Sequence, residues 1–307
     1  MRIFNSDVMR YLEHCEEINL SPSTRKAYKL DIAQFMEFAS ISAQHEGFII
    51  TKDAINLYAN SIKNRFAERT AQRKFASIRV FLGFLEEEGV LSENPIKDVS
   101  ISFRIQPEVP KTVSINEIEC LFKAAWDKHH RAATPFEEFK TLRDIAVLEL
   151  IFSTGLRVCE MCALNNDDIS FNDRTISIKG HSSRARTIKI ENEDVLNTLR
   201  RYAKSRYGVK SECFFVYNVN KPCRFSEQSV RAVIKRLSTS AGIEFHITPN
   251  MIRHTFITLL LNEDVKIQDM QSILGHGSLL ATYVNLPKGT AIKSIPQAVN
   301  PRKFLLI

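Results

Sequence analysis

The sequence predicts a mainly α-helical protein with a small β-sheet, arranged as two domains. Its 307 residues exceed what one small hydrophobic core needs, so two domains are the expectation. Helical periodicity fills the first hundred residues, and after a break with two prolines it continues with one hairpin among further helices. Hydrophobic residues make up 44% and charged residues 25%, a balance that is typical of soluble globular proteins and excludes extended disorder.

Residues 1–100 are expected to form four helices in an all-helical bundle. Capping residues precede the first three helices at Ser6, Ser21 and Thr51. Apolar residues follow each cap at steps of three and four, as one buried helix face requires. The apolar stripe of the fourth helix consists of Ala71, Phe75, Ile78, Leu82 and Leu85. Gly89 then stops this helix.

A basic stripe is predicted on this bundle, because Arg65, Arg69 and Arg73 recur every four residues. Side chains at that spacing project from one face of a helix, and such a face can follow a phosphate backbone. A solvated helix surface is the alternative, and it is the commoner reason for such a stripe. The net charge of +7 suits a polyanionic partner, or equally a basic surface that only keeps the chain soluble.

Residues 101–111 lack periodicity and contain two prolines. They are therefore predicted to link the bundle, residues 1–100, to a second domain, residues 112–307. Ser114 and Glu117 have the spacing of a capping box, so the first helix of the second domain is expected to begin there.

The second domain is expected to hold helices around one hairpin. A helix from about Phe139 to Thr154 ends at Gly155, and a short helical turn from Arg157 to Leu164 follows. Residues 175–179 and 187–190 alternate apolar with polar side chains, which indicates a hairpin. Later helices are expected to begin near Ser226, Thr248 and Lys266.

Membrane, disulfide and metal-binding classes are disfavoured. The longest apolar stretches, such as Ile145–Phe152, fall short of the roughly 18 residues of a spanning helix, and no signal-peptide core follows Met1. We therefore expect no membrane partner and a cytoplasmic protein.

Six cysteines in so long a chain do not make a disulfide framework. Cys159 and Cys162 have the spacing of half a zinc site, but no second close pair follows, so we expect core residues, no metal and no cofactor.

Three basic residues are candidates for chemistry because each lies at the end of a predicted element. Arg157 follows the glycine that ends a helix, Lys179 stands where a strand meets its turn, and Arg253 follows Thr248-Pro249. A guanidinium is planar and always charged, so it can bind two oxygens of a phosphodiester at once. Two arginines and a lysine suit a site for phosphoryl transfer, although each one alone is more commonly a surface or salt-bridge residue.

Four motifs, in the same order, resemble those of the tyrosine recombinases, the phage-integrase family. The run Ser153–Arg157, followed by Glu160 and Leu164, resembles the first signature. Residues Ile178–Gly180 resemble the family's lysine-bearing hairpin. Residues Ile252–Phe256 resemble the second signature, and Ile273–Ser278 followed by Tyr283 resemble the third. In the first domain the matching residues are Leu20–Thr24, Tyr28, Asp31 and Phe35, which resemble the family's SAM-like core-DNA-binding domain. The likeness covers nearly the whole chain.

The resemblance implies a site-specific DNA recombinase that cuts and rejoins strands through a 3′-phosphotyrosine intermediate, without metal or external energy. Tyr283 would be the nucleophile and Lys179 would protonate the departing 5′-oxygen. Arg157 and Arg253 would stabilise the charge of the transition state, and His276 would hydrogen-bond the same phosphate. The partners implied are double-stranded DNA, contacted also by the bundle arginines, and a homotetramer on paired sites. A simple two-domain recombinase, resembling the Xer type or a transposon-encoded one, is favoured over a type IB topoisomerase.

Two departures from the family pattern bear on activity. Asn250 stands where the family usually has a histidine, three residues before the second arginine; it could orient the phosphate, but its amide does not exchange a proton at neutral pH. Tyr283 follows His276 by seven residues instead of the usual nine. The alternative is therefore a catalytically weak or inactive DNA-binding relative that kept the phosphate clamp. Glu160 is expected to support the site without touching DNA.

The carboxy-terminal tail ends in the apolar run Phe304–Ile307. A monomer would have to expose this run or fold it back. The resemblance implies that the tail docks on a neighbouring subunit. The alternative is that it packs on its own domain.

Overall fold

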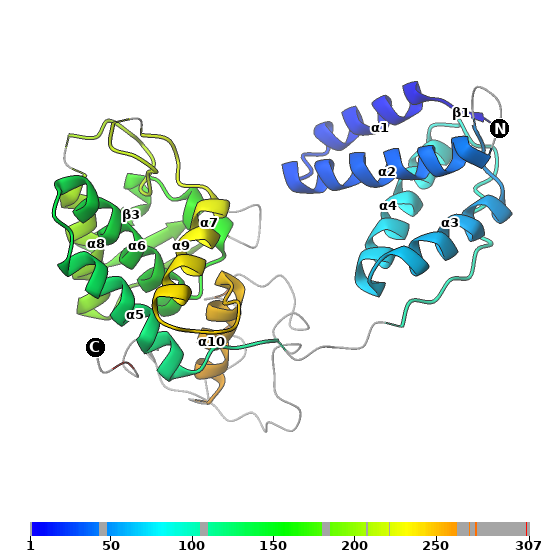
Figure 1. Cartoon of the computed structure of the whole chain (residues 1–307). Coiled ribbons are helices and arrows are strands. Elements are labelled where there is room, and N and C mark those ends of the chain that lie inside the picture. The colour runs from blue at the N-terminus through cyan, green and yellow to red at the C-terminus, as the bar shows by residue number, and fades with distance from the viewer. Residues whose placement is uncertain are drawn as a thin grey trace. The chain divides into compact units, whose positions relative to one another are not determined.

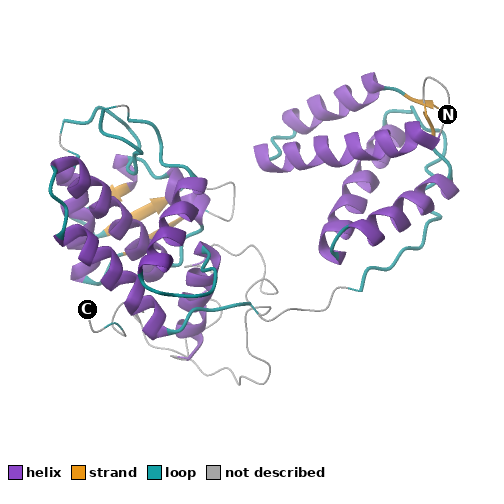
Figure 2. Cartoon of the chain, viewed as in Figure 1, coloured by secondary structure: helices purple, strands orange, loops and turns teal. Residues whose placement is uncertain are grey.

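The computed structural model describes residues 2–42, 48–104, 110–179, 185–206, 208–220, 222–262, 270, 274 and 305. The chain divides into two compact units, Met1–Pro107 and Glu108–Ile307, and the predicted linker spans the boundary between them (Figure 1). Helices dominate both units and the strands are short (Figure 2). The predicted class, mainly α with a small sheet, is confirmed.

The first unit contains the four predicted helices. They are α1 (Asn5–Glu17), α2 (Pro22–Ser42), α3 (Lys52–Arg65) and α4 (Glu68–Glu87). Their apolar faces enclose one core, in which Tyr11, Phe35, Tyr58, Phe75 and Phe81 are buried. Two short strands, β1 (Arg2–Ile3) and β2 (Phe48–Ile49), pair antiparallel beside the helices. The prediction of an all-helical bundle is wrong in this detail, because two-residue strands are too short to show a period of two.

The arginine stripe does not lie on one helix. Arg65 is the last residue of α3, whereas Arg69 and Arg73 belong to α4. Phe66 between them has extended backbone angles (φ −129°, ψ 155°), so the helical phase that the four-residue spacing assumes is interrupted. The prediction of a single helix face is therefore wrong, although all three side chains are exposed.

Asp31 on α2 is a buried carboxylate that joins α2 to α4. It accepts hydrogen bonds from both guanidinium nitrogens of Arg73, from Lys74 Nζ (3.0 Å) and from Ser77 Oγ (2.8 Å). Two cations and a hydroxyl compensate the cost of burying this charge. Arg73 is thus oriented by the bundle interior and is half-exposed at its surface.

The second unit is built around α6 (Pro135–Thr154), which is buried along most of its length. The helix begins four residues before the predicted start, because the Thr134 hydroxyl accepts from the Glu137 N–H (3.2 Å) and Pro135 occupies the first helical position. The other helices of the unit are α5 (Ile115–His130), α7 (Val158–Ala163), α8 (Glu193–Ser205), α9 (Glu227–Ser240) and α10 (Pro249–Asn262). As predicted, Ser114 and Glu117 form a capping box at the start of α5.

A three-stranded antiparallel sheet accompanies these helices. Its strands are β3 (Ile169–Ser170), β4 (Thr175–Ile178) and β5 (Arg186–Lys189), in the order β3-β4-β5. The predicted hairpin is β4–β5, and the two-residue β3 adds an edge that the sequence pattern did not indicate. In the register of the hairpin, Ile178 lies opposite Arg186 in the last pair, so Lys179 is the first residue of β4's side beyond the paired strands.

The helix α10 is attached at two points. The Thr255 hydroxyl accepts from the Val113 N–H (2.8 Å) and donates to the Val113 carbonyl (3.0 Å), which ties α10 to the start of the unit. Phe256 packs in a small apolar cluster that includes Met270 and Leu274. Leu274 is thereby held against α10 two residues before His276. The helix predicted from Lys266, together with His276 and Tyr283, lies outside the described residues.

The tail contributes one described residue, Leu305. Its side chain is buried in the main core of its own chain, which is the arrangement of the alternative stated above. Exchange of the tail between subunits stays a prediction. Within the described part of the chain, no helix has the length and apolar character needed to cross a membrane.

Candidate active site

The turn between α6 and α7 sets the position of the first arginine. Gly155 ends α6 with φ 59° and ψ 26°, a left-handed conformation that glycine adopts without a steric cost. A Cβ at this position would lie 2.7 Å from Cε1 of Phe256 and closer still to Cδ1, so the backbone approaches the ring too closely for any side chain. Two residues later, Arg157 becomes the N-cap of α7.

Glu160 connects Arg157 to a second arginine, Arg186 on β5. Glu160 Oε2 accepts from the backbone N–H of Arg157 (2.9 Å), and Oε1 accepts from its Nη1 (2.9 Å). Arg186 donates to the same two oxygens, at 3.0 Å and 2.9 Å, as a bidentate pair. Burial alone would raise the pKa of Glu160, but the hydrogen bonds from Arg186 and Arg157 and their charges lower it to about 2. The carboxylate is therefore charged at neutral pH.

Arg253 on α10 reaches the same turn from the other side. Its Nη1 donates to the Gly155 carbonyl, and its Nη2 donates to the Leu274 carbonyl (3.3 Å). The Leu274 carbonyl also accepts from Arg157 Nη1 (3.1 Å). Residues from the first, second and third motifs are thus connected through one backbone oxygen, although 117 residues separate Arg157 from Leu274.

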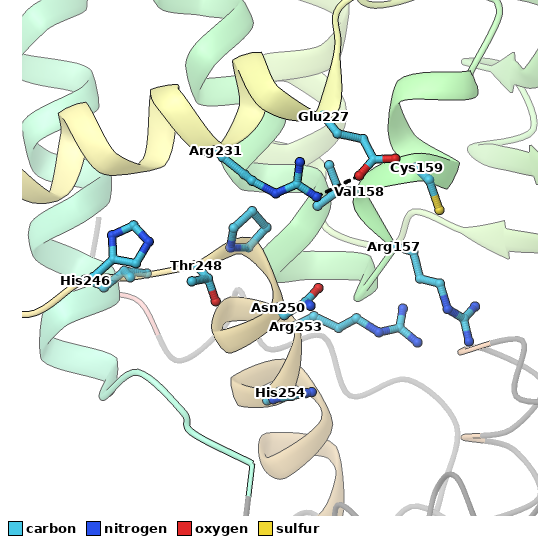
Figure 3. A pocket seen from close by; sticks show the side chains of 12 residues that line it. Arg157, Val158, Cys159, Glu227, Arg231, His246, Thr248, Asn250, Arg253 and His254 are labelled. Carbon is cyan, nitrogen blue, oxygen red and sulfur yellow. Dashed lines mark hydrogen bonds and ion pairs between the residues drawn. The ribbon is translucent and has the colours of Figure 1, made fainter. Parts of the chain in front are cut away.

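A pocket of about 520 Å³ opens beside the two arginines (Figure 3). It is lined by residues of α7, α9 and α10 and of the segment that precedes α10. In Figure 3 the Arg253 side chain extends from α10 toward Arg157, and the Asn250 amide stands near its base. The other polar lining residues are Cys159, Glu227, Arg231, His246, Thr248 and His254.

The electrostatics of this pocket favour an anion. Three guanidinium groups, those of Arg157, Arg186 and Arg253, face one carboxylate, that of Glu160, so the four side chains carry a net charge of +2. Burial lowers the pKa of Arg253 to about 10, and the like charge of Arg157 adds to the effect. Arg253 is nevertheless protonated at neutral pH, and a phosphate group in the pocket would stabilise both cations.

The two arginines differ in access. The Arg157 side chain is 34% exposed, whereas Arg253 is only 6% exposed and is fixed by two carbonyls. Preorganised donors of this kind stabilise charge that develops in a transition state without a cost of reorganisation at that moment. The geometry is therefore suited to hold a phosphodiester while one of its oxygens is exchanged.

Lys179 is directed elsewhere in this structure. Its Nζ lies 2.8 Å from Oδ1 of Asp168, and its side chain is 74% exposed. The hydrogen bond to Asp168 and the charge of this carboxylate raise the pKa of Lys179. Among the described residues, Lys179 is not one of those that line the pocket. It stands at the turn end of the β4–β5 hairpin, directly after β4, and a move from Asp168 would be needed before it could donate a proton at the pocket.

The structure thus brings together three of the predicted site residues, Arg157, Asn250 and Arg253, with Glu160 in contact with the first. His276 and Tyr283 lie outside the described residues. The sequence reasoning missed a set of polar side chains that hold or line this pocket, namely Arg186, Arg231, His246 and His254. For Arg186 a signal existed, because the register of the predicted hairpin would have placed it next to Lys179.

Comparison with known proteins agrees with the fold and the motifs. The family model described as phage integrase family matches residues 116–286, and the model described as phage integrase, N-terminal SAM-like domain, matches residues 8–89. A tyrosine recombinase of Agathobacter rectalis is 34% identical over 287 residues, which cover 92% of each chain. Tyrosine recombinase XerC of Listeria monocytogenes serotype 4b is 30% identical over 274 residues, which cover 87% of this chain and 88% of that protein.

Two solved structures share the fold. One is the XerH site-specific recombinase bound to difH substrate, with a TM-score of 0.68 at 20% identity, covering 90% of this chain and 80% of that one. The other is a lambda integrase tetramer bound to a Holliday junction, with a TM-score of 0.68 at 17% identity, covering 96% and 81%.

A helical amino-terminal unit, followed by a unit in which Arg157 and Arg253 line a pocket and Glu160 accepts hydrogen bonds from Arg157, is the arrangement of a DNA strand-transfer enzyme. The chain belongs to the phage integrase family, and it is a site-specific DNA recombinase of the tyrosine class.

Proposed function

We propose that this recombinase uses Tyr283 as its nucleophile and Arg157 and Arg253 as the clamp for the scissile phosphate. The observation that carries the proposal is the convergence of both guanidinium groups on the Leu274 carbonyl, at 3.1 Å and 3.3 Å. This contact holds Leu274, the described residue of the third motif, close to the arginines of the other two motifs. Both remaining roles, hydrogen bonding by His276 and orientation by Asn250, concern the same phosphate.

The reaction exchanges one phosphodiester for another. The tyrosine oxygen loses its proton to solvent and forms a bond to phosphorus, the bond from phosphorus to the 5′-oxygen breaks, and Lys179 gives that oxygen a proton. The 5′-hydroxyl of a partner strand later attacks the 3′-phosphotyrosine, which releases the tyrosine and restores a phosphodiester. Because the energy of the bond is kept in the intermediate, the overall exchange needs no external energy source.

The DNA partner and the assembly follow from the same proposal. The +2 charge of the pocket and the exposed Arg65, Arg69 and Arg73 of the first unit suit contacts with phosphates. The lambda integrase tetramer on a Holliday junction has this fold, which supports a homotetramer on paired sites. A chain that acts on DNA would work in the cytoplasm or nucleoid.

Trapping the covalent intermediate tests this function. The protein is incubated with a duplex nicked near the cleavage position, so that the released fragment diffuses away and the protein stays attached. Wild-type protein should form an adduct that resists denaturing gel electrophoresis. Tyr283→Phe should bind the same duplex and form none, since only the nucleophilic oxygen is lost. Tyr217→Phe is the matched control, because Tyr217 is an exposed tyrosine of the same unit that lies outside the pocket.

Two outcomes would contradict the proposal. An adduct with Tyr283→Phe would move the nucleophile to another residue. Binding without any adduct from the wild-type protein would establish the alternative, a DNA-binding relative that has lost the chemistry.

A further inference from the structure

Arg186 is a buried charged side chain between Glu160 and the end of the β4–β5 hairpin that carries Lys179. It is the first residue of β5, and its guanidinium donates two hydrogen bonds to the carboxylate of Glu160. The Arg186 side chain is 8% exposed and that of Glu160 is 11% exposed. A bidentate pair with so little access to solvent has one well-defined geometry, because the planes of the guanidinium and the carboxylate must remain aligned.

The same carboxylate holds Arg157. Each oxygen of Glu160 accepts one hydrogen bond from Arg157 and one from Arg186, so the position of Glu160 depends on both arginines. Without Arg186, Arg157 would be the remaining one of these two arginines that donate hydrogen bonds to Glu160. The attraction between Glu160 and Arg157 would then be stronger, so Arg157 would be less well placed to stabilise the charge that develops on the phosphate in the transition state.

Arg186 is also connected to the hairpin end that carries Lys179. It lies opposite Ile178 in the β4–β5 register, and Lys179 is the next residue along β4. Ile178 is buried, so this end of the hairpin is fixed from one side by the core and from the other by the pair with Glu160. A displacement of Arg186 would therefore move the base of the loop that presents Lys179 relative to Arg157.

We infer that Arg186 is a positioning residue for strand transfer, which acts through Glu160 to orient Arg157 and to hold the base of the Lys179 hairpin next to Glu160. The inference rests on the proposed function, since it assigns Arg186 no contact with DNA. Loss of Arg186 should therefore lower the rate of DNA cleavage and leave the affinity for DNA unchanged. A displacement of about 1 Å in a catalytic group costs on the order of a hundredfold in rate.

A dependence on pH distinguishes this role from a merely structural one. In the wild-type protein Glu160 stays ionised throughout the range in which recombination is assayed, because its pKa is lowered to about 2. In Arg186→Met the first of the hydrogen-bond donors that lower this pKa is absent while burial still raises it. Glu160 then takes up a proton as the solution is made mildly acidic, and the cleavage rate of the variant falls in a range where that of the wild type does not.

The experiment measures single-turnover cleavage of the nicked duplex by the full chain, together with DNA affinity. Arg186→Met should cleave about a hundredfold more slowly with unchanged affinity, and Arg186→Lys should recover part of the rate, because lysine restores the charge but not the bidentate geometry. Arg200→Met is the matched control. Arg200 pairs with exposed Glu193 on α8, away from the pocket, so the control loses one arginine and one ion pair but should keep the wild-type rate.

A double-mutant cycle tests whether Arg186 acts through Glu160. In a Glu160→Gln background, Arg186→Met should slow cleavage no further, because the group that it positions has already been changed. The double variant lacks both charges of the buried Glu160–Arg186 pair, so it keeps the test informative if Arg186→Met alone unfolds, as judged by Trp126 fluorescence.

Three results would overturn the inference. They are a wild-type rate for folded Arg186→Met, rate losses that simply add in the double variant, and a loss of DNA affinity that accounts for the slower cleavage. Failure of the proposed function is distinguishable from these, because it would appear as the absence of any adduct with the wild-type protein.

Discussion

Gly155→Ala is predicted to destabilise the second unit and to impair the site at the same time. Gly155 has a left-handed backbone, its Cα faces the ring of Phe256, and its carbonyl accepts from Arg253. A methyl group here meets the ring at 2.7 Å from Cε1 and 3.1 Å from Cγ, with Cδ1 nearer still. Phe256 is buried and packs against Leu274 among others, so it cannot turn aside without disturbing its cluster.

The expected loss in the free energy of unfolding of Gly155→Ala has two parts. A non-glycine residue in the left-handed region costs roughly 1–2 kcal/mol, and overpacking a core typically costs about 1–3 kcal/mol. The sum is about 2–5 kcal/mol, a large fraction of the stability of an ordinary domain. Gly242→Ala is the matched control, since Gly242 has φ 71° in the same unit and a Cβ there would have nothing within 4 Å. Gly242→Ala should lose only the stability that corresponds to the left-handed backbone, about 1–2 kcal/mol.

Urea unfolding followed by tryptophan fluorescence measures this difference. Trp126 is the single tryptophan of the chain and lies on α5, so its emission follows the second unit without a contribution from the first. Gly155→Ala should unfold at lower urea than Gly242→Ala, by a difference of about 1–3 kcal/mol in the free energy of unfolding. Equal losses in the two variants would refute the close approach of Gly155 to Phe256.

Other predictions concern pH, salt and the tail. Since the pKa of Glu160 is lowered to about 2 in the folded chain and is about 4.3 in an unfolded one, Glu160 contributes stability above pH ~4.3 that is lost as the pH falls toward 2. The stability advantage of the wild type over Glu160→Gln, measured by urea unfolding, should therefore shrink by a few kcal/mol across that interval; a constant difference would contradict it. DNA affinity should fall about 10³–10⁵-fold between 50 and 200 mM salt if about six to ten phosphates are contacted, and a flat response in a binding titration would exclude that number of contacts. Deletion of residues 301–307 should reduce cooperative assembly on paired sites while single-site binding survives, and unchanged cooperativity in a native gel would favour packing of the tail on its own chain.

The parts of the site that could be predicted are those whose signals are local in the sequence. The helix end at Gly155, the turn with Arg157 and the start of α10 each depend on a few neighbouring residues with strong conformational preferences. The pairing of β4 with β5 also followed from alternation alone. The convergence of Arg157 with Arg253 was expected only because the motifs resembled those of a known family.

The remaining features depend on contacts between distant residues. Glu160 and Arg186 are 26 positions apart, and their pair joins β5 to α7, two elements that no local pattern brings together. The break between α3 and α4 occurs at Phe66 without a glycine or proline, so packing rather than propensity decides it. The pair of Lys179 with Asp168 joins a hairpin end to a 3₁₀ turn, and no periodicity indicates which acidic residue a lysine will meet.

The most direct test of the central claim is to identify the residue that carries the DNA. The adduct formed on the nicked duplex is digested with nuclease and protease, and the peptide with the remaining nucleotide is sequenced by mass spectrometry. The chain has seven tyrosines, and burial raises the pKa of three of them, Tyr11, Tyr58 and Tyr202, which makes their hydroxyls poor nucleophiles. We expect a 3′-nucleotide on Tyr283. The same modification on any other tyrosine, or none in a protein that binds the duplex, would contradict it.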